Sequence, residues 1–236
     1  MFGKPNSPKR RTLLGRWLRR LIIAFVVALL TPVALAALYR IVPPPSTPLM
    51  VIRAMQGDGA ERRWVSLESM PGHVPLAVMA AEDNLFCEHG GFDWDAIGDA
   101  ISDARAGGRL RGASTVSMQV TRNLFLWPGG GWARKGLEAL WTPPVELLLG
   151  KRRIMEIYLN IAETGSGIFG FEAAARRYYG KPATALTRRE AAAIAAILPN
   201  PRAWQPGAGR AGERVPVLLR RMSDIAPIAL CVRVDG

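Results

Sequence analysis

The stretch "AAEDNLFCEHGGFDWDAI", residues 80–97, joins two helical patterns and gathers acids, a histidine and two glycines in a short space. It places an acid pair, Glu82 and Asp83, at the end of one helical pattern, and a double glycine separates that pattern from the next. Glu82, Phe86 and His89 are spaced by one and two helical turns, which predicts that they share a helix face. Two interpretations are open: a solvated helix end capped by glycines, or a helix that presents a carboxylate for chemistry.

Helical patterns dominate the chain beyond residue 70. Apolar side chains recur at helical spacing in residues 74–86 and 92–106. The segment "TRREAAAIAAIL" opens with Thr187 and Glu190 in capping-box spacing, and "PNP" ends it. Since no run of alternating strands and no internal repeat occurs, the sequence predicts a mainly α domain.

The N-terminal part of the chain has the pattern of a membrane anchor. Residues 1–20 hold seven cations and no acid, and residues 21–39 hold no charge at all. At about 1.5 Å per residue, the apolar run is long enough to cross a bilayer as one helix, and the cations place its N-terminus in the cytoplasm. Ala34-Leu35-Ala36 resembles a signal-peptide cleavage site, but the run is longer than a usual signal core, which favours an uncleaved anchor.

The sequence therefore predicts four parts in order. They are a cytoplasmic basic tail (1–20), a transmembrane helix (21–39), a Pro-rich linker (40–50) containing "IVPPPSTP", and a periplasmic domain (51–236). At the start of that domain, residues 49–70 predict at most a short strand or hairpin, with "GDG" as its turn.

The charge distribution argues against a nucleic-acid-binding protein. The formal net charge is +12, and the basic tail supplies seven of these charges, which leaves an excess of five for the other 216 residues. The most concentrated basic run thus lies beside a membrane. The remaining excess suits a domain that handles anionic substrates or rests on anionic lipid headgroups.

Two cysteines, Cys87 and Cys231, are too few for a disulfide framework. They could pair in an oxidising compartment, but the sequence favours reduced, buried thiols.

Residues 107–135 are rich in Gly, Ser and Thr and predict a long surface loop between two helices. Phe125, Trp127 and Trp132 lie near its end. Their rings could be buried in the core or could enter the membrane interface, and both interpretations remain open.

Four more clusters carry polar side chains, and each of them alone is weak. They are "GASTVSMQVTRN" (112–123), "RKGLE" (134–138), "KRRIMEIYLN" (151–160) and "GSGIFGFEAAARRYYGK" (165–181). In "RKGLE", Arg134 and Lys135 are four and three residues from Glu138, the spacing of ordinary helical ion pairs. The two histidines of the chain lack Cys/His spacing for zinc, and neither a Ser-His-Asp arrangement nor a phosphate-loop lysine pattern is evident.

Taken together and in this order, the clusters resemble the motifs of the peptidoglycan glycosyltransferases of family 51. "EDNLFCEHGG" matches ED-x-x-F-x-x-H-x-G, and "GASTVSMQVTRN" matches G-[GA]-S-T-I-x-Q-Q-x-x-K-N, with Ser117, Met118 and Arg122 as departures. "RKGLE" matches RK-x-x-E, and "KRRIMEIYLN" matches K-x-x-I-[LM]-E-x-YLN. The resemblance covers about residues 65–205. Since no penicillin-binding signature occurs, the chain looks most similar to monofunctional members, which are related to the glycosyltransferase domain of class A penicillin-binding proteins.

The resemblance implies a lysozyme-like glycosyltransferase domain behind a single N-terminal transmembrane helix in the cell inner membrane. It also implies the substrates, lipid II and the lipid-linked growing glycan chain. By motif match, Glu82 is the general base, and Glu138 is a second essential carboxylate that orients the donor or supports its pyrophosphate-binding cations. The candidates for binding the pyrophosphates are Arg134, Lys135 and Lys151.

The same resemblance assigns further residues. Ser114, Gln119 and Asn123 would line the donor groove, and Arg122 keeps a cation for phosphate. For a second group, packing behind the site is an equally good interpretation: Asp83, Phe86, His89, Glu156, Tyr158 and Asn160. No cofactor is required, although Mg²⁺ or Mn²⁺ bridging the pyrophosphate and a carboxylate is compatible with these residues.

Two rival functions follow from the same residues. A muramidase or lytic transglycosylase would also use an α-rich lobe with one essential glutamate, but glycan cleavage gives no reason for grouped cations or a membrane tether. A non-catalytic membrane-anchored scaffold would not need both Glu82 and Glu138. The expected partners are the bilayer, the lipid-linked substrates and cell-division or elongation proteins, with no nucleic acid.

Overall fold

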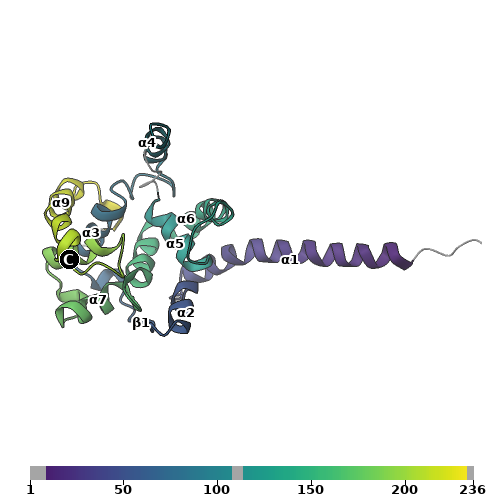
Figure 1. Ribbon diagram of the computed structural model, residues 1–236, viewed down its shortest axis with the longest axis horizontal. Coiled ribbons are helices and arrows are strands. Elements are labelled where there is room, and N and C mark those ends of the chain that lie inside the picture. Colours follow the sequence, from purple (N-terminus) through teal and green to yellow (C-terminus); the bar gives the residue numbers. More distant parts are fainter. Residues whose placement is uncertain (1–8, 108–113, 233–236) are drawn as a thin grey trace, which may run out of the picture.

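The computed structural model describes residues 9–107 and 114–232, and it shows one long helix projecting from a helical body (Figure 1). The long helix is α1 (Lys9–Tyr39), and its part Gly15–Tyr39 is long and apolar enough to cross a membrane. The first eight residues of the predicted basic tail, and the first two of the segment 112–123, lie outside the described residues.

The body is built mainly from helices, which confirms the predicted class. They are α2 (Pro48–Met55), α3 (His73–Glu82), α4 (Trp94–Arg105), α5 (Val116–Phe125), α6 (Trp132–Ile161), α7 (Gly170–Tyr179), α8 (Arg188–Ile197) and α9 (Gly209–Ile225). Short 3-10 turns are η1 (Leu67–Ser69), η2 (Ala183–Ala185) and η3 (Leu230–Val232). The capping box predicted at Thr187 and Glu190 is confirmed at the start of α8.

A small sheet joins the start of the body to its middle. It consists of β1 (Glu61–Arg62), β2 (Glu163–Gly165) and β3 (Ile168–Phe169), in the order β1-β3-β2. β1 is parallel to β3 and β2 is antiparallel to it. The turn between β2 and β3 needs Gly167, because its φ is +68° and a Cβ there would lie 2.0 Å from the Asp58 carbonyl oxygen.

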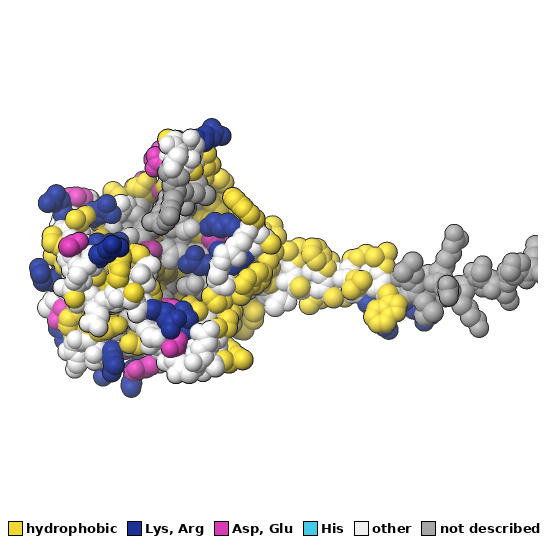
Figure 2. Space-filling view, viewed as in Figure 1, with side chains coloured by type: hydrophobic (Ala, Val, Ile, Leu, Met, Phe, Trp, Pro, Cys, Tyr) yellow, Lys and Arg dark blue, Asp and Glu magenta, His cyan; other side chains and the backbone are white. Residues whose placement is uncertain are grey.

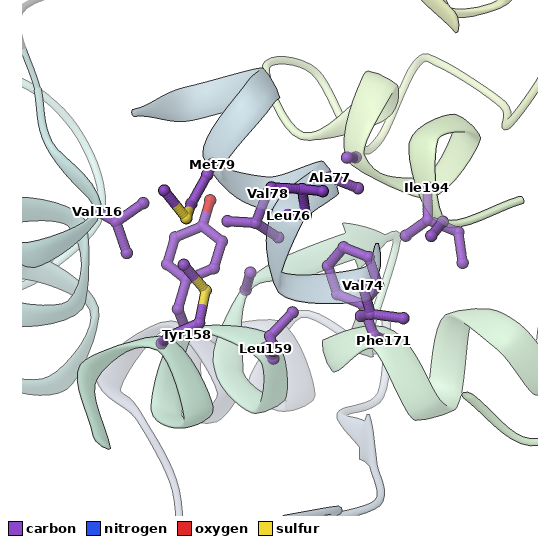
Figure 3. Packing of buried hydrophobic residues seen from close by; sticks show 14 of the residues in the cluster. Val74, Leu76, Ala77, Val78, Met79, Val116, Tyr158, Leu159, Phe171 and Ile194 are labelled. Atoms are coloured by element: carbon purple, nitrogen blue, oxygen red, sulfur yellow. The ribbon is translucent and has the colours of Figure 1, made fainter. Parts of the chain in front are cut away.

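The core forms around α3, which is buried along most of its length. Figure 3 shows its side chains between Tyr158 and Leu159 of α6 on one side and Ile194 of α8 on the other. α3 also packs against α9. On the other side of the body α5 packs along α6, and α6 packs against α1. In Figure 1, α9 therefore lies at the end of the body remote from α1.

The predicted strand or hairpin in residues 49–70 is wrong over its first half, which forms helix α2. Thr47 has extended backbone angles and its hydroxyl accepts a hydrogen bond from the Met50 amide at 3.2 Å. Pro48 occupies the start of the helix, where its missing N–H costs nothing. The extended linker accordingly ends at residue 47, earlier than predicted. β1 then pairs with β3 and not with a neighbouring strand.

The predicted long loop in residues 107–135 is also wrong, because helix α5 occupies its middle. Thr115 caps that helix by accepting from the Met118 amide at 3.1 Å. Phe125, at the end of α5, is half-buried and stacks on Tyr39 of α1 with ring centroids 6.4 Å apart. Trp127 and Trp132, by contrast, are 50% and 86% exposed.

The expectation of reduced cysteines is wrong as well. Cys87 and Cys231 form a disulfide, with their Cα atoms 5.5 Å apart. The fold brings the segment that follows α3 against η3, near the C-terminus. A contact between positions 144 residues apart depends on the whole fold, and no local pattern in the sequence predicts it.

Candidate active site

Helix α3 ends at Glu82, so Glu82, Phe86 and His89 do not share a helix face as predicted. The backbone leaves the helix at Asp83, where φ is −163° and ψ is 82°. The residues that follow form turns, which bury Phe86 and set its ring edge-on to His89 at a centroid distance of 6.3 Å. Ending the helix leaves the Glu82 side chain at its last turn.

Asp83 fixes this turn to the start of α5. Its carboxylate lies 3.0 Å from His89 Nε2 and accepts a hydrogen bond from the Val116 amide at 2.9 Å. Thr115, the N-cap of α5, donates its hydroxyl to the Gly91 carbonyl at 2.7 Å. The acid, the histidine and the double glycine of residues 80–97 therefore hold two segments of the site in register.

Glu82 faces a cleft of about 650 Å³ between the two sides of the body. The lining residues come from the α3–α4 region, from the start of α5 and from the end of α8 and α9: Ala80, Ala81, Glu82, Asp83, Asn84, Leu85, Asp93, Ala96, Ser114, Thr115, Gln119, Arg122, Leu198, Pro199 and Arg221. In Figure 2, Lys and Arg side chains are visible on both sides of the body below the protruding α4.

A chain of hydrogen bonds orients the Glu82 carboxylate. Gln119 Nε2 donates to Glu82 Oε2 at 2.8 Å, and Tyr158 donates its hydroxyl to Gln119 Oε1 at 3.2 Å. Burial raises the pKa of the Tyr158 hydroxyl well above its usual value, so Tyr158 stays a donor and fixes which way the amide points.

Burial also raises the pKa of the Glu82 carboxyl above its ordinary value. The hydrogen bond from Gln119 and the charges of Arg214 and Arg122 act in the opposite direction, while Asp83 adds to the rise. A carboxylate in this setting is a better proton acceptor than an exposed glutamate, because its charged form is less well solvated.

Glu138 is completely buried and is held by two cations of its own helix. Arg134 Nη1 donates to Glu138 Oε2 at 2.7 Å, and Lys135 Nζ donates to Glu138 Oε1 at 2.6 Å. Lys135 Nζ also donates to Ser114 Oγ at 3.1 Å, and Ser114 lines the cleft. The cation cluster of α6 thus reaches the cleft through Lys135 and Ser114.

Other predicted site residues lie away from the cleft. Lys151 pairs with Glu146 at 2.8 Å and its ammonium sits 4.4 Å from the centre of the Phe86 ring, where it supports the turn after α3. Asn123 lines a smaller cavity of about 250 Å³ that shares Arg122 with the cleft.

Glu156 and Asn160 have packing contacts. Glu156 pairs with Arg153 one turn earlier on α6. The side chain of Asn160 accepts from the Val65 amide and donates to the Val65 carbonyl, both at 2.8 Å, and so ties α6 to the segment after β1.

The residues of the cleft do not form a ready ligand set for a resident metal ion. Within residues 9–107 and 114–232, no group of three His, Cys, Asp or Glu side chains is placed to hold one. Both oxygens of Glu138 accept from cations, and the carboxylates that line the cleft are those of Glu82, Asp83 and Asp93.

Reasoning from the sequence missed the contribution of α9. Arg221 of α9 lines the cleft, and Arg214 is close enough for its charge to act on Glu82. Arg214 Nη1 donates to the Ala196 carbonyl at 2.8 Å, at the end of α8. The seven-residue spacing of the two arginines puts them on one face of the helix, and this signal was present in the sequence.

Comparison with known proteins gives one consistent family. A family model described as transglycosylase matches residues 49–223. The biosynthetic peptidoglycan transglycosylase of Rhodospirillum centenum is 51% identical over 227 residues, which cover 95% of this chain and 96% of the relative. The protein of the same name from Caulobacter vibrioides is 48% identical over 197 residues, covering 81% of this chain and 86% of the relative.

Proposed function

Because this chain belongs to the transglycosylase family and is a peptidoglycan transglycosylase, we propose that it polymerises glycan strands from lipid II with Glu82 as the general base. The reaction joins units through β-1,4 bonds, inverts C1 of the donor sugar and releases undecaprenyl pyrophosphate. The observation that carries the proposal is the half-buried Glu82 carboxylate, which faces the cleft and has a neutral amide as its hydrogen-bond partner.

The acceptor hydroxyl must lose its proton as it attacks C1 of the donor. Glu82 Oε2 is engaged by Gln119, and no hydrogen bond from a described residue reaches Oε1, which is left for the acceptor. Burial raises the pKa of this carboxyl, which is the direction that a base working near neutral pH requires. Gln119 and Tyr158 keep the carboxylate in one orientation during the transfer.

The leaving group must have its developing negative charge met by cations. Lys135 and Arg134 are held in place by Glu138, and Lys135 reaches Ser114 at the edge of the cleft. Arg122 lines the same cleft. Cations fixed before the reaction begins stabilise the pyrophosphate without reorganising during it.

The arrangement favours synthesis over glycan cleavage. Most glycosidases use two carboxyl groups, one of them as an acid that protonates a poor leaving group. Glu138 is unsuited to that role, because both of its oxygens accept hydrogen bonds from cations. A pyrophosphate leaves without protonation, and attack from the face opposite the α-linked pyrophosphate gives the β product with a single inversion.

A lipid-linked substrate also fits the position of α1. The Trp141 indole of α6 donates to the Leu29 carbonyl of α1 at 3.1 Å. Leu29 lies ten residues before the end of α1, a rise of about 15 Å. If α1 spans the bilayer with its N-terminus in the cytoplasm, this contact places the Trp141 region of α6 within the periplasmic half of the bilayer. Trp132 and Leu147 of α6, 86% and 83% exposed, would then contact lipid.

The test uses the detergent-purified full chain, fluorescent lipid II and separation of the products on a gel. The parent protein should give a ladder of long glycan, and Glu82→Gln should give none. Glu88→Gln is the matched control, because Glu88 is exposed on the same segment and does not line the cleft. Degradation of polymeric peptidoglycan without synthesis would instead support a muramidase, and activity in neither assay would support a scaffold.

A further inference from the structure

Helix α9 adds a cationic wall to the cleft from outside the motif segments. Arg214 and Arg221 are two helical turns apart and share one face of α9. Arg221 lines the cleft together with Leu198 and Pro199, which follow α8. These residues face the cleft from the side formed by α3, α8 and α9, whereas Ser114, Gln119 and Arg122 belong to the α5 side.

The two arginines differ in what holds them. Arg214 donates to the Ala196 carbonyl, and its guanidinium lies 5.9 Å from the centre of the Trp204 ring. Burial lowers the pKa of Arg214, the charge of Glu82 raises it, and the charge of Arg221 adds a smaller lowering, so Arg221 acts on Arg214 as a nearby like charge. Among the described residues no carboxylate lies within ion-pair distance of Arg221. An exposed cation beside another cation is suited to an anionic ligand.

The position of Arg221 indicates which anionic group of the substrate it could bind. The pyrophosphates of both substrates remain attached to lipid and so belong at the side of the cleft near α6 and α1. Figure 1 shows α9 at the opposite end of the body. The sugars that would lie between these two sides of the cleft are neutral. The other anionic groups of the proposed substrate are the carboxylates of its peptide stem.

We propose that Arg221 is a specificity-determining residue that binds a carboxylate of the peptide stem on a lipid-linked substrate. This inference rests on the proposed polymerase function. In this proposal α9 contacts the peptide stem, which carries neither the reacting hydroxyl nor the leaving group. Binding through a partly exposed, charge-assisted hydrogen bond affects substrate affinity more than the chemical step.

The experiment compares two lipid II preparations, one with free stem carboxylates and one with those carboxylates amidated. Arg221→Gln should raise KM by about two- to fivefold for the acidic stem, with kcat little changed, and should have no effect on KM for the amidated stem. Arg221→Lys should recover most of the affinity. Arg220→Gln is the matched control, because Arg220 is exposed on the same helix and does not line the cleft.

The possible outcomes separate this inference from the proposed function. If the parent chain polymerises both preparations and Arg221→Gln behaves like Arg220→Gln, the inference is wrong and the polymerase function stands. An equal loss on both preparations would also overturn it, since a carboxylate partner would then play no part. If the parent chain polymerises neither preparation, both proposals fail. Thermal unfolding of each variant identifies any loss caused by misfolding.

Discussion

Glu82 and Glu138 are the same residue type in two neighbouring regions, and their surroundings differ in one decisive respect. Glu82 has a neutral amide as its hydrogen-bond partner and faces a cleft. Glu138 is fully buried between an arginine and a lysine of its own helix. Burial without a charged partner leaves a carboxylate basic, whereas burial with two cations makes it a fixed anchor for them.

The pKa of the Glu82 carboxyl is raised because no ion pair offsets the cost of its burial. Glu82 could have been paired with a cation, as Glu138 is, and would then be a weaker base. Arg122 and Arg214 act on Glu82 through their charge, but neither forms an ion pair with it. In the proposed mechanism, one carboxylate stays without an ion pair and serves as the base, and the other organises positive charge.

Replacing Glu82 with Gln should have the largest effect on activity and should not destabilise the fold. Loss of the general base is expected to lower kcat/KM by about 10²–10⁴-fold. The folded-state pKa of Glu82 is raised, so its ionisation costs stability as pH rises from the ordinary glutamate pKa through the raised value. Glu82→Gln removes that cost, and its melting temperature at neutral pH should equal or exceed that of the parent. A clearly lower melting temperature would mean that Glu82 is structural.

Replacing Glu138 with Gln should lower activity and stability together. The change leaves Arg134 buried without its counter-charge, and breaking a buried pair in this way costs about 3 kcal/mol. Chemical denaturation measures the change in the free energy of unfolding. Glu61→Gln is the control, because Glu61 is part of an exposed ion pair of 3.9 Å and should change stability by less than about 0.5 kcal/mol. If Glu138→Gln were as stable as Glu61→Gln, Glu138 would not be a structural anchor, and its contrast with Glu82 would be lost.

The two carboxylates also differ in how far the sequence predicts their surroundings. The partners of Glu138 lie three and four residues away on the same helix, and helical spacing alone brings them together. The capping box at Thr187 was readable for the same reason. Such contacts depend only on local geometry.

The partners of Glu82 could not be read from spacing. Gln119 lies 37 residues further along the chain, and it was assigned to the same groove only through the family resemblance. The Cys87–Cys231 disulfide and the place of Arg221 in the cleft also depend on how α3, α8 and α9 pack. The local signal for helix α2 is the Thr47-Pro48 start, an N-cap residue followed by a proline in the first helical turn, and not the strand-like pattern of residues 49–70.

Removing the disulfide should disturb the Glu82 region more than the Glu138 region. Cys87 lies five residues after Glu82 and is tied to Cys231 across 144 residues, and such a cross-link contributes about 2–4 kcal/mol. Cys231→Ser, compared with the parent under reducing and oxidising conditions, should lose this amount in the unfolding free energy. The reduced parent should match the variant. Hydrogen exchange should increase in residues 83–92 and stay unchanged around Glu138. Uniform loosening of both regions would contradict this.

The smallest effects are expected at Gln119 and Tyr158, and they test whether neutral donors tune the Glu82 carboxyl. Gln119→Leu removes the hydrogen bond that stabilises the charged form of Glu82, so the pKa of that carboxyl should rise further, and the acid limb of kcat/KM against pH should move to higher pH. The loss at neutral pH should be about 0.5–1.5 kcal/mol.

Tyr158→Phe keeps the Gln119 amide and removes the hydroxyl that orients it, so it should shift the acid limb in the same direction by a smaller amount. A stepwise shift from the parent through Tyr158→Phe to Gln119→Leu would show that the titrating group is Glu82 and that neutral donors tune it. If neither variant moves the acid limb while both lower kcat, the limb belongs to another group. The difference between Glu82 and Glu138 would then lie only in their burial and their hydrogen-bond partners.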